Sequence, residues 1–294
     1  MPRAPDQAPR GGTLYVVATP IGNLGDVTLR ALEVLRSVPL VAAEDTRISR
    51  RLFARHEITT RLTSFHAQSG PARLAELLAH LRGGADLALV TDAGTPAVSD
   101  PGAELVSAWA GEGGLVVPIP GASAVLAAVV ASGIAGPRWG FEGFLPRSGR
   151  ERRERLGRIA ADDRSTVLFE APTRLATTLR DLAAACGADR TAAVCRELTK
   201  LHEQIARGTL GELVERVARG EIPQRGELVL VIAAAEAAAA DSSVAPDAEA
   251  IATGRAEVDA LVSGGLGRAE AARRVAAATG LPRRDLYRSD EPGH

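Results

Sequence analysis

The stretch LALVTDAGTPAVSDPG, residues 87–102, is the segment around which the rest of the chain is organised. It begins with four apolar residues, continues into a loop rich in Gly, Pro and Asp, and is followed by a helical pattern. This order predicts a buried strand that ends in a stiff loop, because proline restricts the backbone whereas glycine permits close approach. Ligands of open α/β sheets bind at this carboxyl end of the strands. An ordinary strand-to-helix turn has the same composition, so this loop alone leaves both interpretations open.

Strand and helix patterns alternate on both sides of that stretch. This alternation predicts a mostly parallel sheet covered on both faces, and residues 133–140 form the best internal boundary before a second α/β unit. The expected strands lie at residues 13–19, 39–43, 61–64, 86–91 and 115–118 in the first unit, and at 141–145, 166–170, 191–195 and 226–233 in the second.

The fold class is therefore α/β, with five segments along the chain. We expect a disordered tail at 1–12, α/β domains at 13–136 and 137–236, a linker at 237–248 and a helical tail domain at 249–294. The arginine-rich tail reads as helices joined by Thr-Gly-Leu-Pro. A nucleic-acid-binding helix-turn-helix and a small capping or dimerisation bundle fit it about equally well.

Composition excludes several classes of protein. The net charge is −1, so no global basic field indicates a nucleic-acid partner, and any such site must be a local patch. The two cysteines indicate a reducing cytoplasm without a disulfide framework, and no Cys/His cluster has the spacing of a metal site. No apolar run is long enough for a membrane span. We therefore expect a soluble cytoplasmic protein with no metal and no membrane partner.

Several other strand ends carry the same kind of polar or Gly/Pro loop. They offer hydroxyls, carboxylates, arginines and backbone groups, with one lysine, Lys200, among the 35 basic residues of the chain. Such a set of groups is typical of a site that binds and orients its substrates while a cofactor supplies the reactive group. The loops lie at 20–26, 44–47, 92–102, 120–124, 170–174 and 196–200.

These loops also carry a resemblance to a known family. The ordered motifs ATPIGNLGD, AAEDTR, TDAGTPAVSDPG, PGASA, FEAPTR and RELTK resemble the tetrapyrrole-methylase superfamily and, within it, the ribosomal small-subunit methyltransferase I family, over about residues 13–233. The resemblance implies two α/β domains with a cleft between them and a small C-terminal helical domain. It further implies a homodimer that uses S-adenosylmethionine to methylate the ribose 2′-hydroxyl of a cytidine in the decoding centre of 16S rRNA, as free rRNA or in the small ribosomal subunit.

The resemblance also implies which residues bind the methyl donor. Tetrapyrrole methylases usually have other residues where Pro20-Ile21-Gly22 and Gly94-Thr95-Pro96 stand, and both departures favour the rRNA branch. A tetrapyrrole C-methyltransferase and a non-enzymatic RNA-binding protein remain the alternatives. The implied donor-binding residues are Pro20, Thr95, Pro96, Val98, Ser123, Ala124, Phe169, Glu170 and Ala171.

Methyl transfer further requires groups that orient or deprotonate the hydroxyl and groups that hold RNA. The candidates for the first task are Asp26, Glu44, Asp45 and Lys200, of which the lysine would need a lowered pKa to act as a base. Those for RNA phosphates are Arg47, Arg174 and Arg196. The competing interpretation of each is structural: Asp45 would cap a helix, and the others would form salt bridges that support their loops. Asp92 and Asp100 read as loop-building residues.

Overall fold

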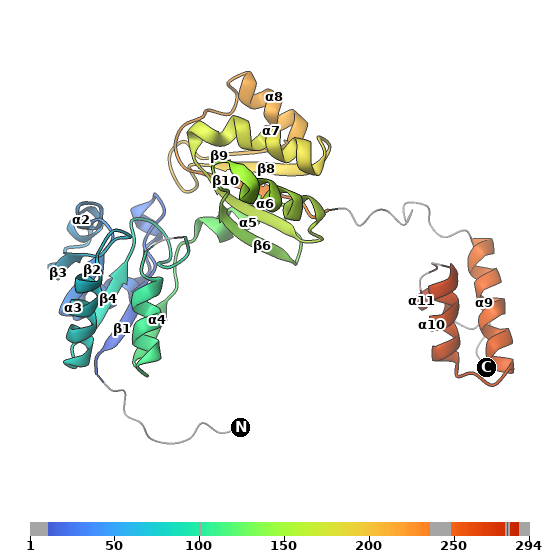
Figure 1. Cartoon of the computed structure of the whole chain (residues 1–294), viewed down its shortest axis with the longest axis horizontal. Coiled ribbons are helices and arrows are strands. Elements are labelled where there is room, and N and C mark those ends of the chain that lie inside the picture. The colour runs from blue at the N-terminus through green and yellow to red at the C-terminus, as the bar shows by residue number, and fades with distance from the viewer. Residues whose placement is uncertain (1–10, 100, 236–247, 280, 282, 288–294) are drawn as a thin grey trace. The chain divides into compact units, whose positions relative to one another are not determined.

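The computed structural model describes residues 11–99, 101–235, 248–279, 281 and 283–287. The chain divides into two compact units, residues 1–235 and 236–294, shown in Figure 1. The first unit holds two five-stranded sheets, and the second holds helices.

The first sheet is parallel throughout, as the alternation of strands and helices predicts. Its strand order is β3-β2-β4-β1-β5, which places β4 at the centre. Loops that follow neighbouring parallel strands gather at one edge of the sheet. The strands are β1 (Thr13–Val17), β2 (Leu40–Ala43), β3 (Arg61–Ser64), β4 (Leu87–Val90) and β5 (Leu115–Ile119).

Helices cover both faces of this sheet, and successive residues of β4 explain why. Leu87 and Leu89 belong to the cluster under one pair of helices, whereas Ala88 and Val90 belong to the cluster under the other. A strand buried on both faces is therefore apolar at every position. The first pair is α3 (Pro71–Arg82) and α4 (Ala103–Gly111); the second is α1 (Leu29–Ser37) and α2 (Thr46–Arg55), and the short helix η1 (Leu24–Asp26) precedes α1.

The second sheet is mixed, with strand order β6-β7-β10-β8-β9. Strand β6 runs parallel to β7, but β10 is antiparallel to both of its neighbours, and β9 is antiparallel to β8. The sequence patterns did not predict β9, an edge strand. The strands are β6 (Trp139–Phe144), β7 (Ser165–Glu170), β8 (Thr191–Arg196), β9 (Gln204–Thr209) and β10 (Leu228–Ile232).

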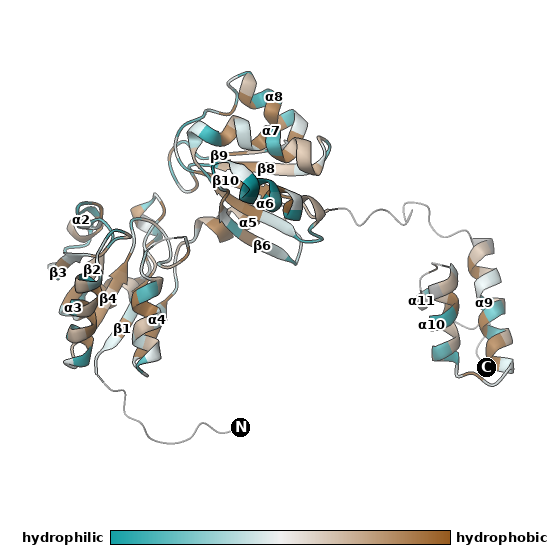
Figure 2. Cartoon of the chain, viewed as in Figure 1, coloured by the Kyte–Doolittle hydropathy of each residue, from teal (hydrophilic) through white to brown (hydrophobic). Residues whose placement is uncertain are grey.

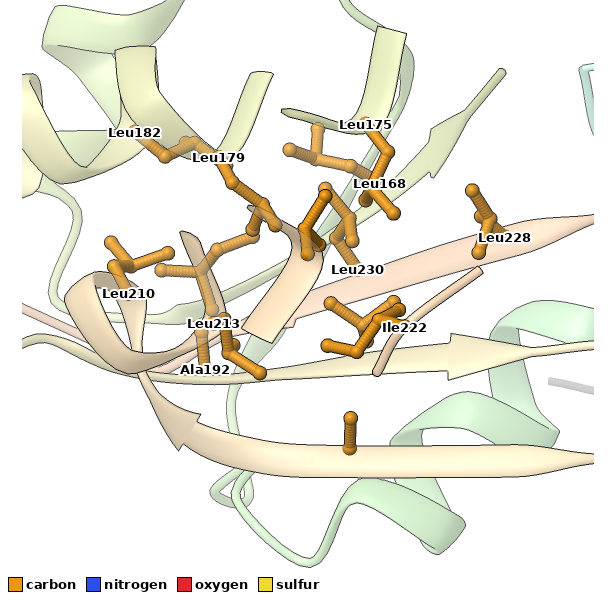
Figure 3. Packing of buried hydrophobic residues seen from close by; sticks show 14 of the residues in the cluster. Leu168, Leu175, Leu179, Leu182, Ala192, Leu210, Leu213, Ile222, Leu228 and Leu230 are labelled. Atoms are coloured by element: carbon orange, nitrogen blue, oxygen red, sulfur yellow. The ribbon is translucent and has the colours of Figure 1, made fainter. Parts of the chain in front are cut away.

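One face of the second sheet packs against three helices. Figure 3 shows Leu168 and Leu230 from the strands among leucines such as Leu179 and Leu213 from the helices. The highly charged α6 is teal over much of its length in Figure 2, although Arg152 on it is only 6% exposed. The helices are α6 (Gly149–Ala161), α7 (Leu175–Cys186), preceded by η2 (Pro172–Arg174), and α8 (Leu210–Ala218).

The other face of the second sheet packs against α5 (Ala124–Ser132), which follows β5 of the first sheet. Val125 and Ala128 of this helix are buried in one cluster with Val229 and Val231 of β10. The predicted domain boundary between residues 136 and 137 therefore does not follow the packing, because α5 serves the second sheet. Because α5 directly follows β5 in the sequence, the order of the elements gave no sign that it packs against the second sheet.

The described chain begins within the predicted N-terminal tail. Residues 1–10 lie outside the described residues, but Gly12 is buried and its N–H donates a 2.7 Å hydrogen bond to the carbonyl of Leu81. Gly11 adopts φ 99° beside Trp109. These two glycines are thus part of the packed unit, contrary to the expected disorder of residues 1–12. The predicted linker, 237–248, lies outside the described residues except for Ala248.

The described residues of the second unit form three helices around a small core of their own. Val258, Val275 and Leu286 are buried there, and Gly254 allows close packing because a Cβ at that position would lie 2.6 Å from Cδ2 of Leu286. Across the described part of the whole chain, no helix is long and apolar enough to cross a membrane. The helices are α9 (Ala248–Ser263), α10 (Arg268–Thr279) and α11 (Arg283–Tyr287).

Candidate functional site

A cavity of about 350 Å³ lies within the first unit, among loops of the first sheet and strand ends of the second. Its volume falls within the roughly 300–1,000 Å³ range of small-molecule sites. Most of its lining is apolar side chains and small residues that bring the backbone close. The lining residues are Ile21, Ala93, Gly94, Thr95, Val98, Ser99, Ser123, Ala124, Val125, Phe144, Phe169, Glu170, Ala171, Pro172, Cys195, Leu198, Gly226, Glu227, Leu228 and Val229.

The loop after β4 forms one wall of this cavity and is fastened to the loop after β1. Thr19 and Gly94 exchange two backbone hydrogen bonds, of 2.9 and 3.0 Å, and the Thr19 hydroxyl donates to the carbonyl of Thr91 at 3.0 Å. Beyond Gly94, both Ala97 (φ 67°) and Ser99 (φ 66°) adopt left-handed conformations. Non-glycine residues adopt such angles at a cost, and they do so mainly where surrounding contacts hold them in place.

The loop after β7 forms another wall, and a buried carboxylate organises it. Glu170 is 3% exposed; its Oε1 accepts from the N–H of Ala171 at 2.8 Å and its Oε2 accepts from Oγ1 of Thr178 at 2.5 Å. Arg174 forms an ion pair with the same carboxylate at 3.3 Å. Thr178 in turn accepts from Nη2 of Arg152 at 3.0 Å. The carboxylate of Glu170 therefore stabilises this wall, and the adjacent residues Phe169 and Ala171 line the cavity.

Aromatic rings and the start of α5 complete the apolar side of the cavity. Phe144 and Phe169 pack edge to face with ring centroids 5.6 Å apart, and Phe144 remains 51% exposed. Ser123 caps α5, accepting from the N–H of Leu126, so the first turn of this helix borders the cavity. Burial raises the pKa of the Cys195 thiol, on the cavity wall, to about 11.

The structure brings most of the predicted donor-binding residues together. Thr95, Val98, Ser123, Ala124, Phe169, Glu170 and Ala171 all line the cavity, whereas Pro20 and Pro96 do not. The two prolines belong to the loops that Thr19 and Gly94 join. Their position favours a supporting role for them in the shape of these loops.

The predicted acids lie outside the cavity lining. Asp45 caps α2, accepting from the N–H of Arg47 at 2.8 Å, and the Arg47 guanidinium holds the pKa of its carboxyl at about 2. Glu44 accepts from the N–H of Asp92, and Asp92 accepts from the N–H of Asp45. Burial and then the charge of Glu44 raise the pKa of Asp92. The structure thus supports a loop-building role for Asp92; Asp26 is exposed in η1, and Asp100 lies outside the described residues.

Lys200 is placed differently from what a general base requires. Its Nζ lies 2.9 Å from Oε1 of Glu197 and 3.0 Å from Oε2 of Glu227. Partial burial lowers the pKa of Lys200, but the hydrogen bonds to these two glutamates outweigh it, so the pKa is raised overall. The lowered pKa that Lys200 would need to act as a base is therefore not found, and Lys200 is an ammonium ion at neutral pH.

The three predicted RNA-binding arginines have different surroundings. Arg47 is exposed at the start of α2 and paired with Asp45, and Arg174 donates to the carbonyl of Leu145 at 2.7 Å. Arg196 is only 6% exposed, and its guanidinium donates to two backbone carbonyls. This buried position contradicts the expected phosphate contact for Arg196, which instead fastens a loop.

Sequence reasoning missed the lining residues at the start of β10. Residues 226–229 lie at the cavity because β10 is antiparallel to β7 and β8, which places its first residue, Leu228, opposite Glu170 and Arg196. The local signal was Gly226-Glu227 directly before an apolar run. Among the described residues, no group of three or more His, Cys, Asp or Glu side chains is arranged to hold a metal ion.

Comparison with known proteins identifies the class to which this arrangement of two sheets around a cavity belongs. The family model described as Tetrapyrrole (Corrin/Porphyrin) Methylases matches residues 13–214. Among solved structures, a cobalt precorrin-4 methyltransferase matches with a TM-score of 0.59 and 21% identity over 75% of this chain and 94% of that one. A Thermus thermophilus uroporphyrin-III C-methyltransferase complexed with S-adenyl homocysteine matches with a TM-score of 0.54 and 20% identity, over 76% and 97% of the two chains. These two likenesses show the shared fold.

A curated relative is much more similar in sequence. The ribosomal RNA small subunit methyltransferase I of Synechocystis is 47% identical over 277 residues, which cover 94% of this chain and 96% of that protein. The chain therefore belongs to the tetrapyrrole methylase family and, within it, to the ribosomal RNA small subunit methyltransferase I family. This confirms the resemblance carried by the six sequence motifs.

Proposed function

We propose that this protein transfers a methyl group from S-adenosylmethionine to the ribose 2′-hydroxyl of a cytidine in the decoding centre of 16S rRNA. The observation that carries the proposal is the cavity at the strand ends, lined by the donor-binding residues that the family resemblance implies. The 47% identical relative supports an rRNA substrate. The tetrapyrrole methyltransferases among the solved structures are 19–21% identical to this chain, which shows a shared fold and not a shared substrate.

The residues of the cavity fit the proposed donor. Small residues such as Gly94, Ala124 and Ala171 leave backbone groups accessible for hydrogen bonds, and Phe169 and Val98 offer apolar contact for a purine ring. When bound, S-adenosylmethionine supplies a methyl group already activated by a sulfonium. The chain must then exclude water, hold the acceptor ribose in line with that methyl group and accept a proton.

Primer extension tests the reaction directly. At low nucleotide concentration, 16S rRNA from a strain carrying this protein should give a stop at the 2′-O-methylated cytidine, and the stop should disappear when the gene is deleted. A plasmid copy should restore it. If the stop persists in the deletion strain, another enzyme makes the modification and the proposal is wrong.

Binding of the donor separates an enzyme from a non-enzymatic RNA-binding protein. Calorimetry should show one site for S-adenosylhomocysteine per chain, and the RNA-binding alternative predicts none. The predicted roles of Asp26, Glu44 and Asp45 in orienting the hydroxyl stay proposals. For Asp45→Asn, which preserves the helix cap, a lower turnover with unchanged donor affinity would support such a role.

We also propose a cytoplasmic homodimer whose substrate is 16S rRNA or the small ribosomal subunit. Leu126 and Val130 of α5 are 53% and 82% exposed on an otherwise packed helix, which supports a partner on that face. Light scattering after size exclusion should give twice the chain mass of 30.5 kDa. The variant Val130→Glu should shift that mass toward the monomer, whereas Leu29→Glu, at an equally exposed site on α1, should leave it unchanged.

A further inference from the structure

Two carboxylates line the cavity, and their surroundings differ. The carboxylate of Glu170 is buried, and both of its oxygens accept hydrogen bonds from the protein. The side chain of Glu227 is 69% exposed, and only its Oε2 is bonded, to Lys200. Within the described part of the chain, Oε1 of Glu227 accepts no hydrogen bond. Glu227 is therefore the cavity carboxylate that has an oxygen available to a substrate.

Glu227 is held in place from both its backbone and its side chain. Its N–H donates to Oε1 of Glu197 at 2.9 Å, and its carbonyl accepts from the N–H of Glu197 at 2.9 Å. Nζ of Lys200 bridges the carboxylates of Glu197 and Glu227. The N–H of Glu227 and then the ammonium of Lys200 lower the pKa of Glu197, so this bridge stays charged. A carboxylate fixed in this way can take up one orientation at the cavity.

The loop that carries Lys200 joins the antiparallel strands β8 and β9, and its backbone is tightly constrained. Glu197 (φ 52°) and Thr199 (φ 68°) are both left-handed, and the hydroxyl of Thr199 is buried without a hydrogen-bond partner. Lys200 also packs against the backbone of Gly22, where a Cβ would lie 2.4 Å from its Cγ. Strain of this kind gathers at functional sites, where contacts over-determine a geometry.

We propose that Glu227 is the catalytic residue that receives the acceptor hydroxyl, and that Lys200 is its positioning residue. The inference rests on the proposed function and names a group that the sequence motifs did not. Asp26, Glu44 and Asp45 do not line the cavity, whereas Glu227 does.

The proton balance of the step is simple. The acceptor oxygen forms its new bond to the methyl carbon while its O–H bond breaks. The electron pair of the broken carbon–sulfur bond stays on sulfur, which becomes neutral. The proton passes to Oε1 of Glu227 and from there to water, which the exposure of this side chain allows.

The test compares Glu227→Gln with the wild type and with a matched control. The amide keeps the shape of the side chain but cannot take a proton, so kcat on small ribosomal subunits should fall by about 10²-fold or more. The dissociation constant of S-adenosylhomocysteine, measured by calorimetry, should change by no more than about twofold. Glu221→Gln removes a glutamate that pairs with Arg219 outside the cavity, and it should change neither quantity.

Lys200→Met tests the positioning residue through a split of the kinetic constants. Without the ammonium, Oε2 of Glu227 loses its hydrogen bond, so kcat should fall while KM for the small ribosomal subunit stays nearly unchanged. Lys200→Arg keeps the positive charge and should restore part of kcat. A merely structural role of Lys200 would lower the fraction of active protein and leave kcat per donor-binding site unchanged.

Three outcomes would overturn the inference. One is unchanged kcat in Glu227→Gln; another is a donor affinity that falls tenfold while kcat persists, which would make Glu227 a donor contact. A third is an unchanged kcat per donor-binding site in Lys200→Met, which would remove Lys200 from the step. If the wild-type protein itself transfers no methyl group to the subunit, the proposed function fails, and that result is distinct from a loss seen only in the variants.

Discussion

Oγ1 of Thr178 donates a 2.5 Å hydrogen bond to Oε2 of Glu170, inside the protein and directly behind the cavity wall. The same hydroxyl accepts from Nη2 of Arg152, which also binds Asp181 at 2.7 Å. A chain of polar contacts therefore runs from α6 through α7 to the end of β7. The position of the cavity wall after β7 depends on this series of polar contacts, because the carboxylate of Glu170 also accepts a hydrogen bond from the N–H of Ala171.

Thr178→Val should loosen this wall. The change removes the hydrogen-bond donor to Oε2 of Glu170 and one of the two acceptors of Nη2 of Arg152, which costs about 1–3 kcal/mol of unfolding free energy, measured by urea denaturation. The affinity for S-adenosylhomocysteine should fall several-fold, because the Glu170 carboxylate that binds the N–H of Ala171 loses one of its own partners. Thr178→Ser should restore both quantities, and Thr177→Val, one residue away on the exposed face of α7, should alter neither. Donor affinity equal to that of the wild type in Thr178→Val would contradict this account.

Asp92→Asn should stabilise the protein at neutral pH. The folded-state pKa of Asp92 lies above the ordinary value of 3.8, so its charged form is disfavoured by burial and by Glu44. A raised pKa contributes stability that is present below the unfolded-state value and lost as pH rises through the folded-state value. Asparagine keeps the acceptor for the N–H of Asp45 without the charge. The melting temperature should rise at pH 7, on the order of 1–2 °C.

The gain from Asp92→Asn should vanish below about pH 3, where the wild-type carboxyl is neutral in both states. Asp189→Asn provides the control, because Asp189 is exposed. It should leave the melting temperature nearly unchanged at both pH values. An equal gain at pH 3 and pH 7 would mean that charge is not the cause.

The two thiols should react very differently with a disulfide reagent. Cys195 is fully buried and its pKa is about 11, whereas Cys186 is half-buried, with a pKa that burial raises less. At pH 8 the native protein should release about one equivalent of thiol slowly, and two in denaturant. Cys186→Ser should abolish the native reaction. If Cys195→Ser abolishes it instead, the cavity wall at Cys195 is more open than the structure indicates.

Gly226→Ala should destabilise the protein more than Gly220→Ala. Both glycines have a positive φ, 79° and 76°, so the backbone cost of alanine is similar, about 1–2 kcal/mol. A Cβ on Gly226 would also lie 2.5 Å from Cδ of Glu197, whereas one on Gly220 meets nothing within 4 Å. The extra loss of unfolding free energy in Gly226→Ala, measured in urea, therefore reports the contact with Glu197. Equal losses of unfolding free energy in the two variants would show that the Glu197 side chain moves away from the new Cβ at no cost.

The sequence could predict the parallel sheet and most of one cavity wall because those features are local. Apolar runs followed by Gly/Pro loops mark the ends of β1 and β4, and parallel strands bring such ends to one edge. Asp45 as a helix cap is equally local, since it depends on the N–H two residues later. Local patterns could predict neither the position of Glu227 at the cavity nor the sheet that α5 covers.

Strand direction and helix partner are properties of the whole fold. An apolar run has the same pattern whether its strand runs toward the cavity or away from it. The antiparallel direction of β10, which brings Glu227 to the site, therefore could not be predicted. In the same way, the repeat of Ala and Val in α5 does not say which sheet it covers. The burial of Arg152 within a run of charged residues could not be predicted from the sequence, because its partner, Asp181, comes from another helix.

The paired hydrogen bonds between Thr19 and Gly94 bear on how ligands exchange. Separating the loop after β1 from the loop after β4 would break both bonds, at a net cost of about 1 kcal/mol each, in addition to the contact of the Thr19 hydroxyl. We expect this wall to behave as one rigid piece, because the paired bonds join the two loops at a single point. Breaking that pair should therefore change the residence time of a bound nucleoside more than a substitution in either loop that leaves both bonds intact.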